Sequence, residues 1–148
     1  FGLAEHDGLL DVLEDESRSV EEVLVRTDLN DIQVLTAGRK HAQSTELLAS
    51  NRMAKLIDDL AKRYPDRIIV LDSPPLLITS EAQALAQQVG QIALVVESGK
   101  TGHHELTETL ETLDNSKPIN VILNKSIYSQ PGGYYGGGYG YYGFNEPE

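Results

Sequence analysis

Apolar positions in the first half of the chain recur with helical and strand periods. Residues 8–25 predict two short helices, the second beginning at Ser19 with Glu22 at capping-box spacing. Residues 31–38 (DIQVLTAG) alternate between apolar and polar positions, which predicts a strand. Across residues 44–64 the apolar side chains return at i, i+3, i+4 and i+7, so we expect one long amphipathic helix that ends at the following proline.

The second half alternates compact apolar runs with amphipathic stretches. Residues 67–72 (RIIVLD) form a β-branched run typical of a strand buried on both faces of a parallel sheet. A helix with Ser80 and Gln83 at capping-box spacing comes next. Further elements are then predicted as a strand at 91–98, a helix at 103–113 and a strand at 119–125.

Strand, helix, strand, helix, strand is the order of an α/β fold, with a parallel sheet flanked by helices. Ligands of such sheets bind at the carboxyl ends of the strands. Three segments occupy that place here, namely 72–75, 98–101 and 124–125.

Asp72 follows four aliphatic residues, which is the form of a Walker B element. A rigid strand end holds such a carboxylate where it can position Mg²⁺, usually through a water of the ion. The alternative is that Asp72 caps the turn that Pro74 and Pro75 enforce.

The other two segments give weaker signals. Gly99-Lys100-Thr101 lacks the glycine that a phosphate-binding loop needs five residues before Gly99, because position 94 is Leu, so Lys100 is interpreted as a loop residue. Asn124 has an amide that suits a base edge, and it equally suits a turn at a strand end. The four histidines have no ligand-like spacing and are expected at the surface.

Composition narrows the class of protein. The chain has 148 residues, a formal net charge of −11 and a pI near 4.7, with no basic stripe, which argues against binding to nucleic acid. It has no cysteine, no apolar run long enough for a membrane helix and no signal peptide, so we expect a soluble protein compatible with a reducing cytoplasm. Because it begins with Phe1, we interpret it as a fragment or a processed chain.

Residues 128–148 differ from the rest of the chain. They hold six of the seven tyrosines and seven of the thirteen glycines, with no Lys or Arg. Such a segment buries too little apolar surface to offset its ordering entropy, so we expect a disordered tail after a folded part at 1–127. The tail is open to three interpretations: a flexible tail with no task, an adhesive aromatic segment of the prion-like kind, or a set of phosphoacceptors.

Five segments in order, followed by this tail, resemble the bacterial tyrosine autokinases (BY-kinases) of polysaccharide synthesis and export, particularly those of exosortase-type systems. The segments are FGLAEHDGLLDVL, VLTAGRKHAQSTELLASNRMAKLIDDLAKRY, RIIVLDSPPLL, ALVVESGKT and VILNK. The resemblance implies a P-loop NTPase fold of the MinD and ParA type, and transfer of the ATP γ-phosphate to tyrosines. It makes Asp72 the carboxylate that helps to hold Mg²⁺ and Asn124 a contact to adenine. The implied phosphoacceptors are Tyr134, Tyr135, Tyr139, Tyr141 and Tyr142, with Tyr128 as a further candidate.

The chain departs from the family pattern at its beginning. Neither a Walker A loop nor the family's second aspartate motif occurs in the 148 residues. The resemblance therefore implies the carboxyl-terminal part of a kinase domain, incomplete at its N-terminus, inactive alone, and with an unprotected strand edge at 68–72.

The resemblance also implies a setting for the parent protein. It would be cytoplasmic and peripheral to the inner membrane through a membrane-embedded polysaccharide co-polymerase, and it would assemble into a homo-oligomeric ring. Two other functions stay open: a MinD- or ParA-like positioning ATPase, and a non-enzymatic pseudokinase or interaction module.

Overall fold

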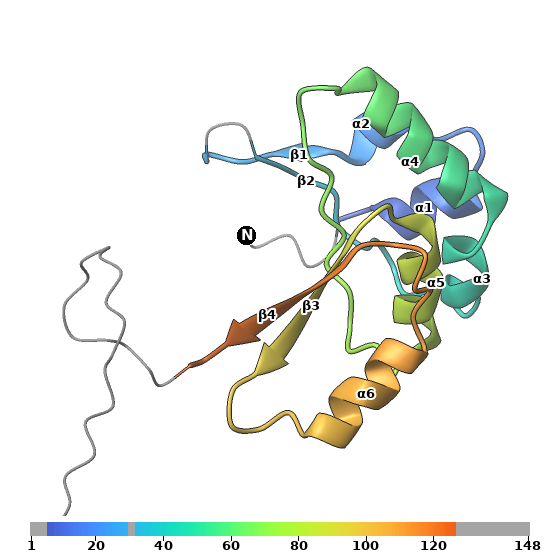
Figure 1. The fold of residues 1–148 in the computed structure, drawn as a ribbon. Helices are drawn as coiled ribbons and strands as arrows, with labels where there is room; N and C mark the ends of the chain where they lie inside the picture. The colour runs from blue at the N-terminus through green and yellow to red at the C-terminus, as the bar shows by residue number, and fades with distance from the viewer. Residues whose placement is uncertain (1–5, 30–31, 127–148) are drawn as a thin grey trace, which may run out of the picture.

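The computed structural model describes residues 6–29 and 32–126, and all interpretations of residues 127–148 lie outside this part of the chain. Figure 1 shows helices and strands in mixed order. The helices are α1 (Leu9–Glu14), α2 (Val20–Val23), α3 (Ser44–Leu48), α4 (Asn51–Arg63), α5 (Ser80–Gln88) and α6 (His103–Glu111). The strands are β1 (Val25–Arg26), β2 (Gln33–Val34), β3 (Ile92–Glu97) and β4 (Ile119–Asn124).

The strands form two separate pairs. β3 and β4 are parallel, in register from Ile92 opposite Ile119 to Glu97 opposite Asn124, and α6 connects them. This strand–helix–strand unit was predicted. β1 and β2 pair antiparallel. The β1 strand was not predicted, because it has only two residues and Val25 continues the apolar pattern of the preceding helix. Within the described residues, the predicted parallel sheet is therefore present only as the β3–β4 pair.

The predicted strand at 67–72 is wrong as an element. These residues form neither a strand nor a helix, and side chains expected inside a sheet are open to solvent, with Ile68 91% and Val70 80% exposed. A strand is defined by its ladder of hydrogen bonds, and neither β2 nor β3 supplies one to this segment. Double-sided burial also fails for β4, whose Val121, Ile122 and Leu123 are all exposed.

Two helix predictions need correction. The helix expected over 44–64 is divided into α3 and α4, because Ser50 is extended (φ −73°, ψ 157°) and its side chain caps α4 by accepting from the Met53 N–H. Helix α5 is capped by Thr79 rather than by Ser80, since the Thr79 hydroxyl accepts from the Ala82 N–H. The expected end of α4 before Pro65 is confirmed, with Tyr64 as its last boundary residue.

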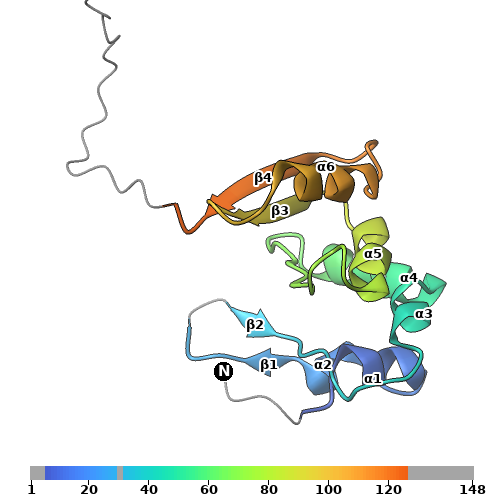
Figure 2. The same ribbon diagram turned by 90° about the horizontal axis from the view of Figure 1, so that it is seen from below.

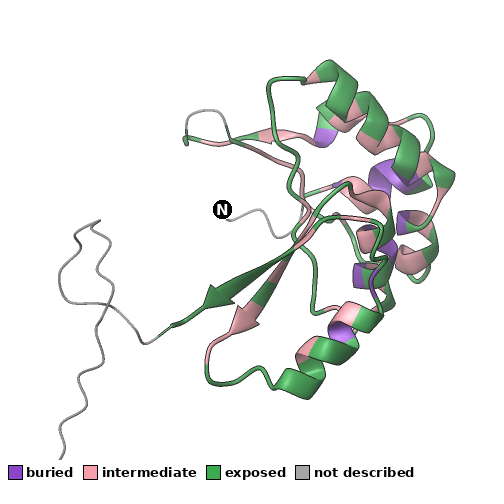
Figure 3. Ribbon diagram, in the orientation of Figure 1, coloured by how far each residue is buried: buried purple, intermediate pink, exposed green. Residues whose placement is uncertain are grey.

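The hydrophobic core lies among the helices and not against the strands (Figure 3). Met53 of α4 is fully buried and packs with side chains of α1, α3 and α5, namely Leu13, Leu48, Ala84 and Leu85. Leu71, which lies in the segment at 67–72, is partly buried and packs against this cluster. The core therefore anchors one side of residues 67–72 and leaves the other side uncovered.

None of the helices in residues 6–29 and 32–126 has the length and apolar character needed to cross a bilayer.

Candidate functional site

Two of the three predicted site segments meet at the carboxyl ends of β3 and β4. Glu97 and Asn124 are partners in the parallel register, and the Ser98 N–H donates to the Asn124 carbonyl over 2.9 Å. The parallel pairing thus brings residues 98–101 and 124–125 together, as the fold class predicts for strand ends.

At this edge Glu97 forms ion pairs with two lysines. Its carboxylate lies 3.0 Å from the Lys125 ammonium and 3.3 Å from the Lys100 ammonium. The hydrogen bond from Lys125, with help from Lys100, lowers the pKa of Glu97. Because Lys100 is paired with Glu97 in a turn that contains Gly99 (φ 73°), its interpretation as a loop residue is confirmed.

Asn124 uses half of its amide within this turn. Its Oδ1 accepts from the Lys125 N–H over 2.8 Å, while Lys125 itself adopts a left-handed backbone conformation (φ 54°). The amide nitrogen of Asn124 has no partner within the described part of the chain, and the residue is exposed. Asn124 therefore forms the turn, as one of the two interpretations predicted. Its amide N–H groups remain available to a ligand, and the contact to adenine stays a prediction.

Asp72 stands apart from the Glu97 cluster. It is exposed at the end of residues 67–72, and among residues 6–29 and 32–126 it makes no hydrogen bond or ion pair. Throughout the same ranges, no three His, Cys, Asp or Glu side chains converge as a metal site. A lone free carboxylate fits Mg²⁺ held through its waters, and it does not fit a metal held by protein ligands alone.

Sequence reasoning missed a buried carboxylate at the start of α1. Asp11 is 6% exposed, and its Oδ2 accepts from the Gly8 N–H (2.8 Å) and the Arg39 N–H (3.1 Å), while its Oδ1 accepts from the Arg39 side chain (2.8 Å). Burial alone raises the pKa of Asp11, but the bonds from Gly8 and Arg39 outweigh burial and lower it. Asp7 extends the network by pairing with Arg39 at 3.1 Å.

Two glycines allow this arrangement. A Cβ on Gly8 would lie 2.3 Å from the Thr36 carbonyl oxygen, and one on Gly38 (φ 87°) would lie 2.3 Å from the Asp11 Oδ2. The N-terminus of α1 and the loop after β2 therefore touch backbone to backbone. The only sequence signal was an acidic residue three positions after a glycine, which is also an ordinary helix start.

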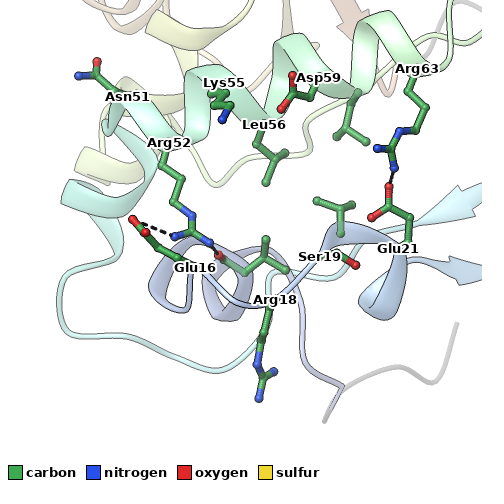
Figure 4. Close-up of a pocket in the computed structure, with 13 residues that line it drawn as sticks. Glu16, Arg18, Ser19, Glu21, Asn51, Arg52, Lys55, Leu56, Asp59 and Arg63 are labelled. Atoms are coloured by element: carbon green, nitrogen blue, oxygen red, sulfur yellow. Dashed lines mark hydrogen bonds and ion pairs between the residues drawn. The ribbon is translucent and has the colours of Figure 1, made fainter.

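A pocket of about 530 Å³ lies between α4 and the α1–α2 segment (Figure 4). Its floor is apolar, with Leu56 and Leu60 from α4, and ion pairs of Arg52 with Glu16 and Arg63 with Glu21 bridge its two walls. It contains none of the predicted site residues. Its basic side chains are largely engaged by acids, so it has no evident specificity for an anion.

Comparison with known proteins gives a consistent result, although no family model matches the chain. The chain is 31% identical to tyrosine-protein kinase YwqD of Bacillus subtilis over 145 residues, covering 97% of this chain and 58% of YwqD. It is 28% identical to the putative tyrosine-protein kinase CapB of Staphylococcus aureus, covering 91% of this chain and 59% of CapB. The succinoglycan biosynthesis transport protein ExoP of Rhizobium meliloti is 36% identical over 74% of this chain and 14% of ExoP.

The fold agrees with the sequence match. The VpsO kinase domain superposes with a TM-score of 0.73 at 30% identity, covering 82% of this chain and 60% of that domain. The chain belongs to the bacterial tyrosine-protein kinases. The family predicted from the five segments is thus confirmed, while the exosortase-associated subtype stays a prediction. The chain spans less than three fifths of the length of CapB and YwqD.

Proposed function

We propose that this chain is the part of a BY-kinase that contains the Walker B carboxylate and the tyrosines to be phosphorylated. One observation carries the proposal: the match to YwqD covers 97% of the chain. That coverage leaves only about four of the 148 residues unmatched, so it includes most of the Tyr/Gly-rich segment at 128–148. The similarity to a tyrosine kinase thus includes both residues 1–127 and most of residues 128–148. This supports one autokinase in which the two parts act together, and not an ATPase with an unrelated tail.

The reaction assigned to this unit is phosphoryl transfer from Mg·ATP to tyrosine. The tyrosine oxygen forms a bond to the γ-phosphorus as the bond to the ADP oxygen breaks, and the phenolic proton leaves to solvent or a base. The acceptors are Tyr134, Tyr135, Tyr139, Tyr141 and Tyr142, with Tyr128 as a further candidate. Mg²⁺, when bound, neutralises charge on the phosphates.

The positions of the chain's own residues support the roles that we propose for them. Asp72, which is exposed and has no partner in the described part of the chain, would help to hold Mg²⁺ through waters of the ion. Asn124 donates its free amide N–H to the adenine edge, while its Oδ1 holds the turn. Neither residue supplies a phosphate-binding loop, and Lys100 is engaged by Glu97, which supports the proposal that these residues alone do not transfer phosphate.

The cellular setting rests on the relatives. The similarity to ExoP, a succinoglycan biosynthesis transport protein, supports a role in polysaccharide synthesis or export. We therefore assign the parent protein to the cytoplasmic side of the inner membrane, with a membrane-embedded co-polymerase as its partner and a homo-oligomeric ring as its assembly. Each phosphate on the tail would add about −1.5 to −2 charges, so phosphorylation would loosen that ring by repulsion.

Phosphotyrosine mapping by mass spectrometry on the full-length gene product, after incubation with Mg·ATP, tests the proposal. We expect phosphate on tyrosines 134–142 in the wild type and a loss of at least tenfold in Asp72→Asn. Asp66→Asn is the matched control, because Asp66 is also exposed and lies in the turn after α4. An unmodified tail with intact ATP hydrolysis would instead favour the positioning ATPase, and no ATP binding would favour the interaction module.

A further inference from the structure

One half of the Asn124 amide is committed to the turn after β4. Its Oδ1 accepts from the Lys125 N–H over 2.8 Å, which turns the oxygen toward the backbone and leaves the NH₂ group without a partner in the described part of the chain. Adenine offers an acceptor at N7 and a donor at N6, so an asparagine that binds it alone uses both halves of its amide. Asn124 can therefore supply the donor, and the acceptor has to come from a neighbouring residue.

Glu97 is the neighbour of Asn124 across the parallel pair. Figures 1 and 2 show β3 and β4 side by side and ending at the same edge. Glu97 and Asn124 are the last register partners of these strands, so their side chains lie on the same face. Ligands of α/β sheets bind at this edge. A carboxylate and an amide N–H thus lie next to each other where a ligand is expected.

The carboxylate of Glu97 is held in place and kept ionised. The Glu97 N–H donates to the Thr101 hydroxyl over 3.0 Å, and the Glu97 carbonyl accepts from the Thr101 N–H over 3.0 Å. Oε1 lies 3.0 Å from the Lys125 ammonium and Oε2 lies 3.3 Å from the Lys100 ammonium, and these contacts lower the pKa of Glu97. An ionised carboxylate only accepts hydrogen bonds, and each oxygen has a further lone pair beyond its lysine contact. Glu97 is therefore a fixed acceptor with capacity left for a ligand.

The two lysines also balance the charge of Glu97. One carboxylate between two ammonium groups leaves the cluster with a net positive charge, so the cluster does not repel the phosphates of a nucleotide. The side chain of Glu97 is 32% exposed, and those of Lys100 and Lys125 are 75% and 63% exposed. Charge and access thus both permit a nucleotide base to contact Glu97.

We infer that Glu97 is a specificity-determining residue that accepts a hydrogen bond from the exocyclic N6 amine of adenine, beside the Asn124 amide, which donates to a ring nitrogen. The pair distinguishes ATP from GTP, because guanine has a carbonyl oxygen in place of the amine and would direct that oxygen at a carboxylate. A site that hydrogen-bonds a group of the substrate strongly rejects an analogue without that group, because its own polar atoms are then left unpaired. This inference rests on the proposed role of Asn124 in binding ATP.

Competition binding on the full-length gene product tests the inference without reference to phosphoryl transfer. A fluorescent ATP labelled on its ribose is displaced by ATP, by GTP and by purine riboside triphosphate, which lacks the N6 amine. We expect the wild type to bind ATP about tenfold more tightly than either competitor, and Glu97→Ala to bind all three within about threefold of one another. Glu111→Ala is the matched control and should keep the wild-type preference, because Glu111 is exposed at the end of α6 and makes no ion pair within the described residues.

A purely structural role of Glu97 predicts a different result. Loss of its lysine pairs alone would weaken the binding of all three nucleotides by the same factor, and an unchanged ratio in Glu97→Ala would overturn the inference. Glu97→Gln is a second variant, whose amide can accept from adenine or donate to guanine, so its preference for ATP over GTP should fall while its affinity for ATP stays within about threefold of the wild type.

The wild type separates this inference from the proposed function. A wild-type protein that binds none of the three nucleotides would overturn the proposed function itself. A wild-type protein that binds ATP and GTP equally well would leave the proposed function intact and overturn the assignment of Glu97 alone.

Discussion

At the scale of single residues, Asp11 is a buried carboxylate held by three hydrogen bonds. Its carboxylate accepts hydrogen bonds from two backbone N–H groups and one guanidinium, and it is almost fully buried. Bonds that involve a charged group are stronger than neutral ones, and loss of one partner leaves the others unsatisfied. Asp11 thereby joins the start of α1 to the loop after β2.

Replacing Asp11 by Asn should destabilise the protein by about 2–3 kcal/mol near neutral pH, because an amide NH₂ would then face a donor from Gly8 or Arg39. The pKa of Asp11 is lowered on folding, so its charge contributes stability above the unfolded pKa of about 3.9 and loses it as pH falls through the folded value. Urea unfolding from pH 7 to pH 3 should show a wild-type advantage that is constant down to about pH 5 and then shrinks.

Asp66→Asn serves as the control for this experiment, because Asp66 is exposed and its loss should change stability by less than about 0.5 kcal/mol. A difference between wild type and Asp11→Asn that persists unchanged to pH 3 would show that the charge of Asp11 is not what stabilises the contact.

At the scale of elements, the break between α3 and α4 depends on Ser50. Its hydroxyl accepts from the Met53 N–H at 3.2 Å and donates to the Leu47 carbonyl at 2.6 Å, so one side chain serves the start of α4 and the end of α3. Serine is a preferred N-cap because its oxygen replaces the missing helical acceptor. Met53, three residues after this break, is buried in the core.

Substitution of Ser50 by Ala should cost about 1 kcal/mol in the free energy of unfolding, measured by urea unfolding followed by circular dichroism. The matched variant is Ser19→Ala, since Ser19 is the N-cap of α2 but makes no side-chain cap bond to the helix backbone. An equal loss in both variants would mean that the Ser50 cap contributes nothing specific.

The elements show which parts of the fold can be predicted from sequence. The period of α4 and the proline after it are local signals, so its face and its end were predicted correctly. The break at Ser50 was missed because apolar periodicity continues across one extended residue. Residues 67–72 were predicted as a buried strand from composition, but pairing depends on a neighbour that the local pattern does not contain.

The candidate site, too, could be predicted from the sequence only in part. The meeting of segments 98–101 and 124–125 could be predicted because parallel strands place their carboxyl ends together. The network of Asp11 with Arg39 could not, since it joins residues 28 positions apart through the backbone of two glycines. Asp72 was assigned from its motif, and its role stays a prediction.

At the scale of the whole molecule, both parts of the chain have a negative net charge. The part up to residue 127 has a net charge of −9, and residues 128–148 add −2 across 21 positions that hold six tyrosines. Phosphorylation of several of these tyrosines would make the segment the most densely charged part of the protein. Any assembly that packs it against the acidic remainder would then be weakened.

Removal of residues 128–148 from the full-length gene product should abolish tyrosine phosphorylation and leave ATP hydrolysis within about twofold of the wild type. The physical reason is that the proposed acceptors lie in this segment, while Asp72 and Asn124, the proposed contacts to Mg²⁺ and adenine, lie before it. Phosphate release and phosphotyrosine are measured on the same sample. Phosphotyrosine that survives the deletion would place the acceptors elsewhere, with Tyr64 as the one tyrosine left in residues 1–127.

The backbone contact between Gly8 and Gly38 constrains how this family can change through evolution. A methyl group at either position would collide with the opposite segment. A protein with a single substitution at one of these positions would therefore be destabilised. Positions 8, 11, 38 and 39 are therefore expected to be inherited as a block and replaced together. A homologue with a side chain at position 8 should possess a loop after β2 of different length, and its acidic residue at position 11 should be gone.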